Sequence, residues 1–283
     1  MRVDAHHHLF DMGRREYPWM DGPWADPIRR TFTATDLEAV CAPHGIAQTV
    51  VVQAVSEVEE TRDLLAAPRV AGVVGWIDLT APDVADVIAA LREGPGGQAL
   101  VGIRHQVHDE PDPDWLDRDD VRRGLRAVAD ARLVYDLLLR ERELPAARRA
   151  VAALPQLSFV VDHLAKPRIA DGALRPWADE IAALAGYDNV VAKLSGLVTE
   201  ADWGTWTIRQ LQPYVEHALE CFGPVRLLFG SDWPVCLLAA SYDRVVEAAE
   251  ATLEGLDATE RDAVFGANTR RVYRLPPAQT SWS

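Results

Sequence analysis

The sequence has few cysteines, few basic residues and no long apolar run, and each shortage excludes a class of protein. Its three cysteines, an odd number without Cys-x-x-Cys spacing, argue against a disulfide framework and favour a reducing compartment. Lysine and arginine number 29 against 43 acidic residues, and the net charge of −14 would repel nucleic acid or an anionic membrane. No run reaches the roughly 18 apolar residues of a membrane helix, and the N-terminus lacks a signal-peptide pattern. We therefore expect a cytoplasmic protein with a small-molecule partner, and leave homo-oligomerisation open.

The length and the order of sequence patterns predict a single (β/α)8 barrel, the TIM-barrel fold, over residues 1–283. A barrel of this type typically has about 250 residues, close to the 283 here. Runs rich in valine and leucine predict eight strands, at 2–6, 47–53, 70–77, 100–105, 132–139, 157–163, 189–196 and 225–232. Helical periodicity follows each of them, at 36–45, 57–67, 82–94, 119–131, 143–154, 174–186, 206–223 and 242–255. Alternation of this kind favours a parallel sheet that helices cover on its outer face.

Two connections are longer than the usual few residues. Residues 10–33, inserted between the first strand and the first helix, contain Tyr17, Trp19 and Trp24. Long loops are often functional lids, and the aromatic content favours a lid here. The loop after the fourth strand, 106–117, is the second. Both would lie at the C-terminal face of the barrel, where active sites of this fold are built.

The first strand contains a His-x-His motif. Because strand side chains alternate, we expect Asp4, His6 and His8 on one face and His7 on the other, in a structural role. Two imidazoles that converge, joined by a carboxylate from the last strand, suit a metal site or a proton-transfer site. A tag remnant or a cluster of hydrogen-bonded structural histidines is the alternative.

Polar residues stand at the ends of four predicted strands, where a purely structural strand would simply stop. They are His6 and His8, Arg104 and His105, Asp162 and His163, and Asp232. The C-terminal ends of barrel strands meet around one mouth, so these side chains are expected to form one site. A single histidine at a strand end is more often a hydrogen-bonded surface group, but the set favours function.

Several motifs together resemble one family. They are DAHHHLFD followed by YPWM, then GIRHQVHDEPD, DHLAKP, KLSG and FGSDWPV, with GANTRRVYRL near the end. The combination resembles the amidohydrolase-related (amidohydrolase 2) branch of the amidohydrolase superfamily. Within that branch it is similar to lactonases of sugar acids, the L-fuconolactonase and L-rhamnono-lactonase type, and to 2-pyrone-4,6-dicarboxylate lactonases. The resemblance implies a (β/α)8 barrel and hydrolysis at an activated carbonyl.

The resemblance also implies roles for particular residues. The histidine pair on the first strand matches His6 and His8, the strand-6 histidine matches His163, and the strand-8 aspartate matches Asp232. Binuclear members carry a bridging lysine or glutamate on strand 4 and a histidine on strand 5. Strand 4 here ends with Arg104 instead, and strand 5 offers only Asp136, which could orient a ligand. We therefore expect at most one divalent, zinc-like ion, and metal-independent catalysis stays open.

The predicted reaction is the opening of a sugar-derived lactone, an EC 3.1.1-type carboxylic-ester hydrolysis. Either a metal held by His6, His8, His163 and Asp232 acidifies water, or Asp232 acts as base while Arg104 and the histidines stabilise the oxyanion. The residues expected to bind substrate are Arg104, His105, Trp19, Tyr17, His108 and Lys193. Because only Arg104, with Arg168 as a second, offers a guanidinium for a carboxylate, a neutral aldonolactone is favoured over a dicarboxylated pyrone. The alternatives are a decarboxylase or hydratase of a carboxylated ring, and a non-catalytic ligand-binding barrel.

Overall fold

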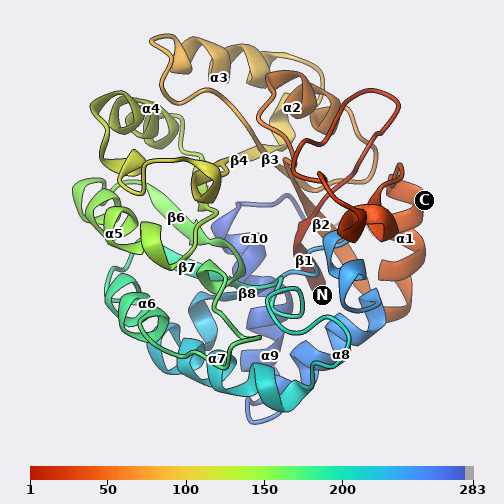
Figure 1. The fold of residues 1–283 in the computed structure, drawn as a ribbon. Coiled ribbons are helices and arrows are strands. Elements are labelled where there is room, and N and C mark those ends of the chain that lie inside the picture. The colour runs from red at the N-terminus through yellow and green to blue at the C-terminus, as the bar shows by residue number, and fades with distance from the viewer. Residues whose placement is uncertain (278–283) are drawn as a thin grey trace.

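Eight parallel strands form a nearly closed barrel in the computed structural model, which describes residues 1–277 of the chain. Each strand pairs with the next in chain order, as Figure 1 shows in a view along the barrel. The strands are β1 (Arg2–His7), β2 (Ile46–Val52), β3 (Gly72–Gly75), β4 (Leu100–His105), β5 (Val134–Leu137), β6 (Ser158–Val161), β7 (Val190–Leu194) and β8 (Leu227–Phe229). The predicted (β/α)8 fold is confirmed.

Helices surround the barrel on its outer face (Figure 1). They are α1 (Ala34–Cys41), α2 (Val58–Leu65), α3 (Val84–Glu93), α4 (Asp119–Asp130), α5 (Leu144–Ala153), α6 (Trp177–Ala185), α7 (Ile208–Phe222) and α8 (Tyr242–Thr252). Two short helices follow, α9 (Ala258–Asp262) and α10 (Asn268–Val272), with a π-helical turn between them. Within residues 1–277 no helix combines the length and the hydropathy that crossing a bilayer requires.

The strands are apolar on both faces because they separate two cores. Val50 and Val52 of β2 belong to the inner core, whereas Val51 between them packs against the helices, as the two-residue period of a strand requires. The inner core also contains Tyr273 and Leu275 from the segment after α10. This C-terminal segment therefore fills the end of the barrel at which the strands begin.

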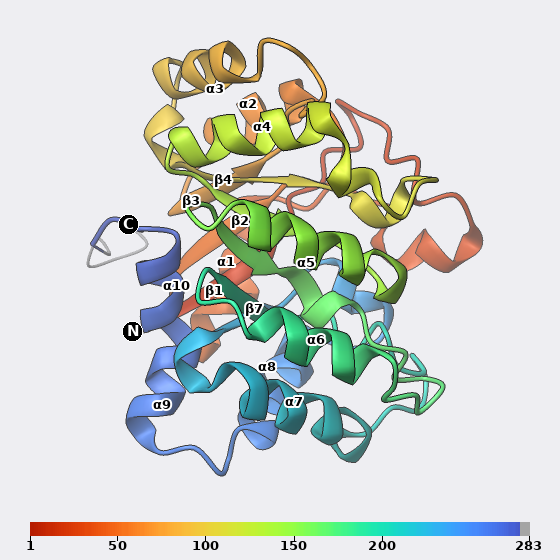
Figure 2. The same cartoon turned by 90° about the vertical axis from the view of Figure 1, so that its left-hand side faces the viewer.

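The two long connections lie at the opposite end of the barrel from the N-terminus and α10 (Figure 2). Residues 10–33 contain one 3-10 helix, Pro23–Ile28, and residues 106–117 contain two, Val107–Asp109 and Trp115–Asp117.

Several strands are shorter than predicted. The expected strands at 157–163 and 225–232 end early because His163 (φ 54°) and Asp232 (φ 57°) have left-handed backbone conformations, which no strand accommodates. Residues 278–283 of the predicted domain lie outside the described residues.

The barrel closes through residues that follow β8. The backbone N–H of Asp232 donates to the carbonyl of His6 at 2.8 Å, and the N–H of His8 donates to the carbonyl of Trp233 at 2.7 Å. His7 and Trp233 form an isolated parallel bridge. The start of the chain therefore lies beside residues 232 and 233, more than two hundred positions away in sequence.

Candidate active site at the barrel mouth

Between Asp4 and His7, β1 contains one more residue than the stretch of β2 that pairs with it. Asp4 pairs with Thr49 and His7 with Val51, so three steps along β1 match two along β2, which is a β-bulge. The bulge breaks the alternation expected from the sequence. Asp4 turns toward the outer helices, where its Oδ2 accepts a hydrogen bond from the Tyr242 hydroxyl of α8 at 3.0 Å. The expectation that Asp4 shares a face with His6 and His8 is therefore wrong.

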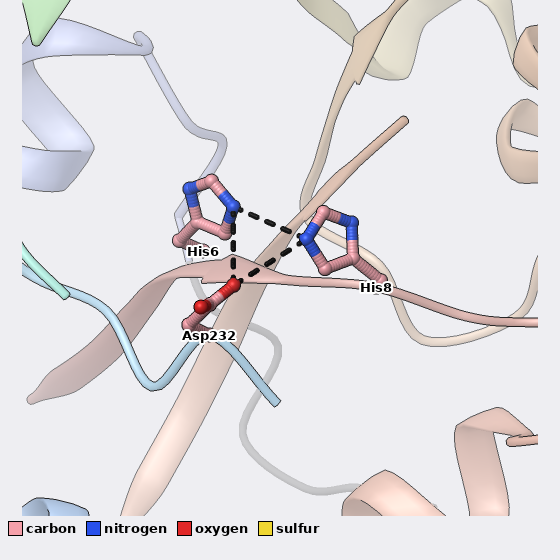
Figure 3. Close-up of side chains that lie close together, drawn as sticks. All are labelled: His6, His8 and Asp232. Carbon is pink, nitrogen blue, oxygen red and sulfur yellow. Dashed lines mark hydrogen bonds and ion pairs between the residues drawn. The ribbon is translucent and has the colours of Figure 1, made fainter. Parts of the chain in front are cut away.

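Three ligand atoms form a nearly equilateral triangle at the mouth of the barrel (Figure 3). His6 Nε2 lies 3.3 Å from His8 Nε2 and 3.7 Å from Asp232 Oδ1, and His8 Nε2 lies 3.5 Å from the same oxygen. The point equidistant from the corners of such a triangle is about 2.0 Å from each, the length of a zinc–nitrogen or zinc–oxygen bond. These residues, called the ligand triangle below, can therefore hold one divalent cation.

Both histidines of the ligand triangle, His6 and His8, are oriented by hydrogen-bond partners of their Nδ1 atoms. The Nδ1 atom of His8 lies 2.7 Å from the carbonyl oxygen of Val52 and donates to it, which leaves the Nε2 lone pair directed into the triangle. The Nδ1 atom of His6 lies 3.4 Å from Asp162 Oδ1 and 3.2 Å from the Lys193 ammonium. Burial lowers the pKa of His6 well below its usual value, despite the opposing effect of Asp162. His6 is therefore a neutral imidazole, as a metal ligand must be.

The left-handed backbone at Asp232 directs its carboxylate toward His6 and His8. Its N–H is held by the His6 carbonyl, and its own carbonyl accepts from the Cys236 N–H at 2.8 Å. Burial by itself raises the pKa of Asp232, but the neighbouring histidines, His163 first, lower it below the ordinary value. The carboxylate is consequently ionised at neutral pH and supplies negative charge to the triangle.

His163 begins a left-handed stretch that is unusual for residues other than glycine. Residues 163–166 have φ values of 49–58°, and the Lys166 N–H closes the turn on the His163 carbonyl at 2.9 Å. Such backbone costs roughly 1–2 kcal/mol per residue. The imidazole lies over Gly196, where a Cβ would be 2.6 Å from its Nδ1, and that Nδ1 is 2.8 Å from Ser195 Oγ. Only glycine leaves room for the ring at this position.

His163 lies beside the ligand triangle and not in it. Its Nε2 is 3.9 Å from Asp232 Oδ1, and the second close group of ligand atoms joins it to His6 and Asp162. Burial lowers the pKa of His163 to about 4, so the ring is neutral at neutral pH. Of the four metal ligands expected from the sequence, three come together around one point and the fourth is adjacent.

Two cations and two carboxylates are buried directly behind the histidines. Arg104 Nη1 contacts Asp162 Oδ2 at 3.0 Å, and Lys193 Nζ contacts Asp162 Oδ1 at 2.9 Å and Asp136 Oδ2 at 2.5 Å. The four charges cancel, so this cluster adds no net charge beside Asp232, whose neighbours His6 and His163 are neutral because burial lowers the pKa of each ring. Both oxygens of Asp162 are engaged by cations, which argues against a metal ion at the second group.

A cavity of about 360 Å³ adjoins the ligand triangle. Ligand-binding cavities are typically about 300–1,000 Å³ in volume. Its lining divides into an aromatic and aliphatic part and a polar part. The first consists of Trp19, Trp24, Ala54, Leu138, Trp203, Val235 and Leu238; the second of His8, Arg104, Gln106, His108, Asp109, Arg140, His163, Lys166, Thr199, Glu200 and Asp232. Such a cavity suits a ligand with hydroxyl groups and apolar ring faces.

Three of the six residues expected to bind substrate, Trp19, Arg104 and His108, line this cavity together with Trp24 of the 10–33 loop. Trp19 and Trp24 come from the 10–33 loop, with ring centroids 6.3 Å apart, and Trp19 is fixed by donating from Nε1 to the Ala54 carbonyl at 3.0 Å. Arg104 and His108 come from β4 and the loop that follows it. The predicted involvement of both long loops thus agrees with the placement of these side chains.

Three other expected residues are used structurally. The Tyr17 ring is buried, and its hydroxyl accepts from the Asp11 N–H at 2.8 Å. His105 accepts from the Trp76 indole at 2.9 Å, contacts Glu110 at 2.7 Å and stacks on Trp115. Lys193 is fully buried among carboxylates. None of the three is among the residues that line the cavity.

Arg168, the expected second guanidinium, is also outside the cavity. It is exposed and forms ion pairs with Glu141 and Asp171.

Several cavity residues were not predicted from the sequence. Lys166, which follows His163 in the left-handed turn, pairs with Glu200 at 2.7 Å on the cavity wall. Arg140 follows β5, and its guanidinium has no ion pair within the described residues. Its position just beyond a strand end could have indicated it, as for Arg104. Trp203, whose ring lies 6.2 Å from that of Trp24, comes from the loop after β7, where no periodicity marks it.

The sequence is similar to a known protein family and to a curated enzyme. Residues 3–275 match the profile of the family described as Amidohydrolase. The chain is 39% identical over 291 residues to the L-fucono-1,5-lactonase of Burkholderia multivorans, an alignment that covers 98% of this chain and 97% of the relative.

The fold is similar to those of two solved structures. The crystal structure of an amidohydrolase from Burkholderia multivorans with bound zinc superposes with a TM-score of 0.92 at 40% identity, covering 98% of this chain and all of the other. A 2,6-dihydroxybenzoate decarboxylase from Rhizobium superposes with a TM-score of 0.63 at 14% identity over 96% of this chain and 98% of its own. The second likeness shows the fold alone.

Proposed function

Because the chain belongs to the amidohydrolase family, we propose that it is a hydrolase that opens a sugar-derived lactone by attack of water at the ester carbonyl. The observation that carries the proposal is the ligand triangle of His6, His8 and Asp232 beside a cavity with aromatic and polar walls. The lactonase relative, aligned over nearly the whole of both chains, supports a sugar lactone as the substrate class.

One zinc-like ion would be held by His6, His8 and Asp232, with His163 beside them. Two imidazole nitrogens and one carboxylate oxygen form a donor set that zinc accepts, and three protein ligands leave a position open, as in catalytic zinc sites. When bound, such an ion polarises a carbonyl and lowers the pKa of water next to it. The zinc-bound structure of the related amidohydrolase supports this assignment.

The protein residues would act on the water and on the carbonyl oxygen. Asp232 accepts a proton as the water oxygen bonds to the carbonyl carbon. Arg104, whose buried Nε has no hydrogen-bond partner in the described part of the chain, donates to the carbonyl oxygen as it gains negative charge. The proton then passes from Asp232 to the ring oxygen as the carbon–oxygen bond breaks, which leaves an open hydroxy acid. Because a carboxylate with a lowered pKa is a weak base, hydrolysis assisted by the ion is favoured over the metal-free route.

The cavity favours a neutral, polyhydroxylated lactone over a dicarboxylated pyrone. On the polar wall, Glu200 neutralises Lys166, and Asp109 lies 3.2 Å from His108. Arg140 is the cation on this wall that has no carboxylate partner among the described residues. A dianion would call for several free guanidiniums. The hydroxyl groups of a sugar lactone can form hydrogen bonds with the mixed donors and acceptors of the polar wall, and its ring can pack against the tryptophans. The decarboxylase alternative has fold likeness alone behind it, and an intact ligand triangle opposes a non-catalytic barrel.

The test is a specificity panel on purified protein. Five- and six-membered sugar lactones, L-fucono-1,5-lactone among them, are compared with 2-pyrone-4,6-dicarboxylate by pH-indicator kinetics. We expect the highest kcat/KM on a sugar lactone, loss of activity after chelation, and recovery with zinc. His8→Gln should abolish that recovery, whereas His44→Gln, a surface control, should not. No turnover of any lactone would overturn the proposal, and a preference for the dicarboxylate would overturn its substrate class. Full activity in metal-free protein would overturn the role of the ion.

The proposal also covers the boundaries of the domain and the cellular location of the protein. Residues 1–283 act as one barrel domain with the 10–33 loop as its lid. Three free cysteines, Cys41, Cys221 and Cys236, support a reducing, cytoplasmic location. The acidic charge of the chain supports a small-molecule partner and opposes nucleic acid.

A further inference from the structure

Three features remain outside the proposed reaction: the buried Lys193 on β7, Asp136 on β5 and the C-terminal segment after α10. They come from distant parts of the sequence but meet inside the barrel. Figure 1 shows α10 at the centre of the ring of strands, and Figure 2 places it at the end of the barrel where the N-terminus lies. From there Tyr273 enters the inner core.

An unbroken series of buried contacts joins Tyr273 to a corner of the ligand triangle. The Tyr273 hydroxyl contacts both oxygens of Asp136, at 2.9 and 2.8 Å. Asp136 Oδ2 contacts Lys193 Nζ at 2.5 Å, and Lys193 Nζ lies 2.9 Å from Asp162 Oδ1 and 3.2 Å from His6 Nδ1. All five side chains are at most 2% exposed. The contacts span the barrel from the C-terminal segment to the site.

The Lys193 ammonium and Asp162 compete for the same nitrogen of His6. If Lys193 donated a hydrogen bond to Nδ1, the imidazole proton would be on Nε2. A protonated Nε2 has no free lone pair and could not bind a metal ion in the ligand triangle. If Lys193 gives its protons to Asp136 and Asp162, then His6 Nδ1–H donates to Asp162, 3.4 Å away, and Nε2 is free. The tautomer of His6 therefore depends on how firmly Asp136 holds Lys193.

We propose that Tyr273 is a positioning residue: by fixing Asp136, it keeps Lys193 on the two carboxylates and so selects the His6 tautomer whose Nε2 faces the ligand triangle. The inference rests on the proposed function, because it concerns the same metal site. It gives the C-terminal segment a role in binding the metal in addition to filling the end of the barrel.

Leu275 provides a control, because it enters the same inner core from the same segment but has only an aliphatic side chain. Tyr273→Phe keeps the ring and removes only the hydroxyl. Leu275→Ala removes packing and leaves the contacts with Asp136 in place. A loss of stability is expected in both variants, so stability alone does not distinguish a positioning role from a structural one.

The first experiment measures zinc affinity by competition with a chromophoric chelator, together with kcat and KM on a sugar lactone. Residues behind metal ligands typically contribute about 10–100-fold to metal affinity. We expect Tyr273→Phe to bind zinc at least about tenfold more weakly and to lower kcat at saturating zinc with KM nearly unchanged, whereas Leu275→Ala keeps the wild-type zinc affinity. Equal zinc affinity in Tyr273→Phe and wild type, or equal losses in both variants, would overturn the proposal.

A second measurement uses the wild-type chain, so it does not depend on the folding of a variant. Long-range ¹H–¹⁵N spectra of histidine-labelled, metal-free protein report which ring nitrogen carries the proton, and His6→Gln assigns the signal. We expect His6 in the Nδ1–H form before zinc is added, and the Nε2–H form would overturn the proposal. If wild-type protein binds zinc but opens no lactone, the proposed function fails while this inference is still decided by the spectra and the affinities.

Discussion

Replacing Glu60 by glutamine should change how the stability of the barrel depends on pH. Glu60 on α2 is fully buried, and its Oε2 accepts hydrogen bonds from the N–H groups of Ala54 at 2.9 Å and Val55 at 3.0 Å. Burial raises its pKa to about 7 from an ordinary value of 4.5, although the two N–H donors and Arg15 act in the opposite direction. Glutamine keeps the accepting oxygen and removes the charge.

The sign and size of the effect follow from linkage. Since the folded state binds the Glu60 proton more tightly than the unfolded state, the stabilisation is fully present below pH 4.5 and is lost as the pH rises through about 7. At about 1.4 kcal/mol per pH unit, the interval between the two pKa values corresponds to about 3 kcal/mol. For a chain of this size that is a shift of about 6 °C in the thermal midpoint. Glu60→Gln should escape this loss.

The assay is the thermal midpoint, followed by circular dichroism from pH 4 to pH 9, for wild type and variant. The difference between them should rise by about 6 °C in favour of Glu60→Gln between pH 4.5 and pH 8. Glu59→Gln, an exposed site on the same helix, is the matched control and should give a nearly constant difference. A constant difference for Glu60→Gln as well would refute the assignment of a neutral, buried carboxyl group.

Three further predictions concern the site directly. Asp232→Asn should fold but lose on the order of 10²-fold or more in turnover, as expected for a positioned base; near-normal kcat in a folded variant would remove that role. Elemental analysis after expression with zinc should find no more than one ion per chain, because Arg104 and Lys193 engage Asp162; two stoichiometric ions would contradict this. Ala165→Gly should raise the thermal midpoint, since Ala165 has φ 58°, whereas Ala127→Gly in α4 should lower stability by about 1 kcal/mol; a lower midpoint for both would refute the argument.

The barrel could be predicted because its signals are local and repeated. Each strand has a valine-rich run and each helix its own periodicity, so errors at the ends of elements do not accumulate. The ends themselves were less predictable. His163 and Asp232 read as strand residues from their apolar neighbours, but both have left-handed backbone imposed by the turns that follow. The bulge that turns Asp4 outward is likewise invisible to a rule of strict alternation.

The candidate site was predictable where a strand end supplied the residue. His6, His8, Arg104, His163 and Asp232 all follow this rule, and all come together at the mouth.

The loop residues, Lys193 and one strand-end residue, His105, did not follow it. Tyr17 and His105 have hydrogen-bond partners, from the lid and from Trp76, that no sequence pattern specifies. Lys193 is the second-last residue of β7, and its ammonium contacts Asp136 on β5 and Asp162 just after β6. Arg140 and Trp203 reach the cavity through loop paths that only the folded chain defines.

The ligand triangle exists only when the two ends of the barrel sheet are joined. Asp4 shows why, because its Oδ1 accepts from the N–H of His6 at 3.1 Å and from the N–H of Ser231 at 2.9 Å. The Asp4 carboxylate thereby fixes the backbone of His6 and the backbone of Ser231, the residue before Asp232. The His6 carbonyl receives the N–H of Asp232 at the same junction. Separation of β1 from the residues after β8 would move two corners of the triangle apart even if every other strand pair stayed intact, so metal affinity should be more sensitive to this junction than to any other part of the sheet.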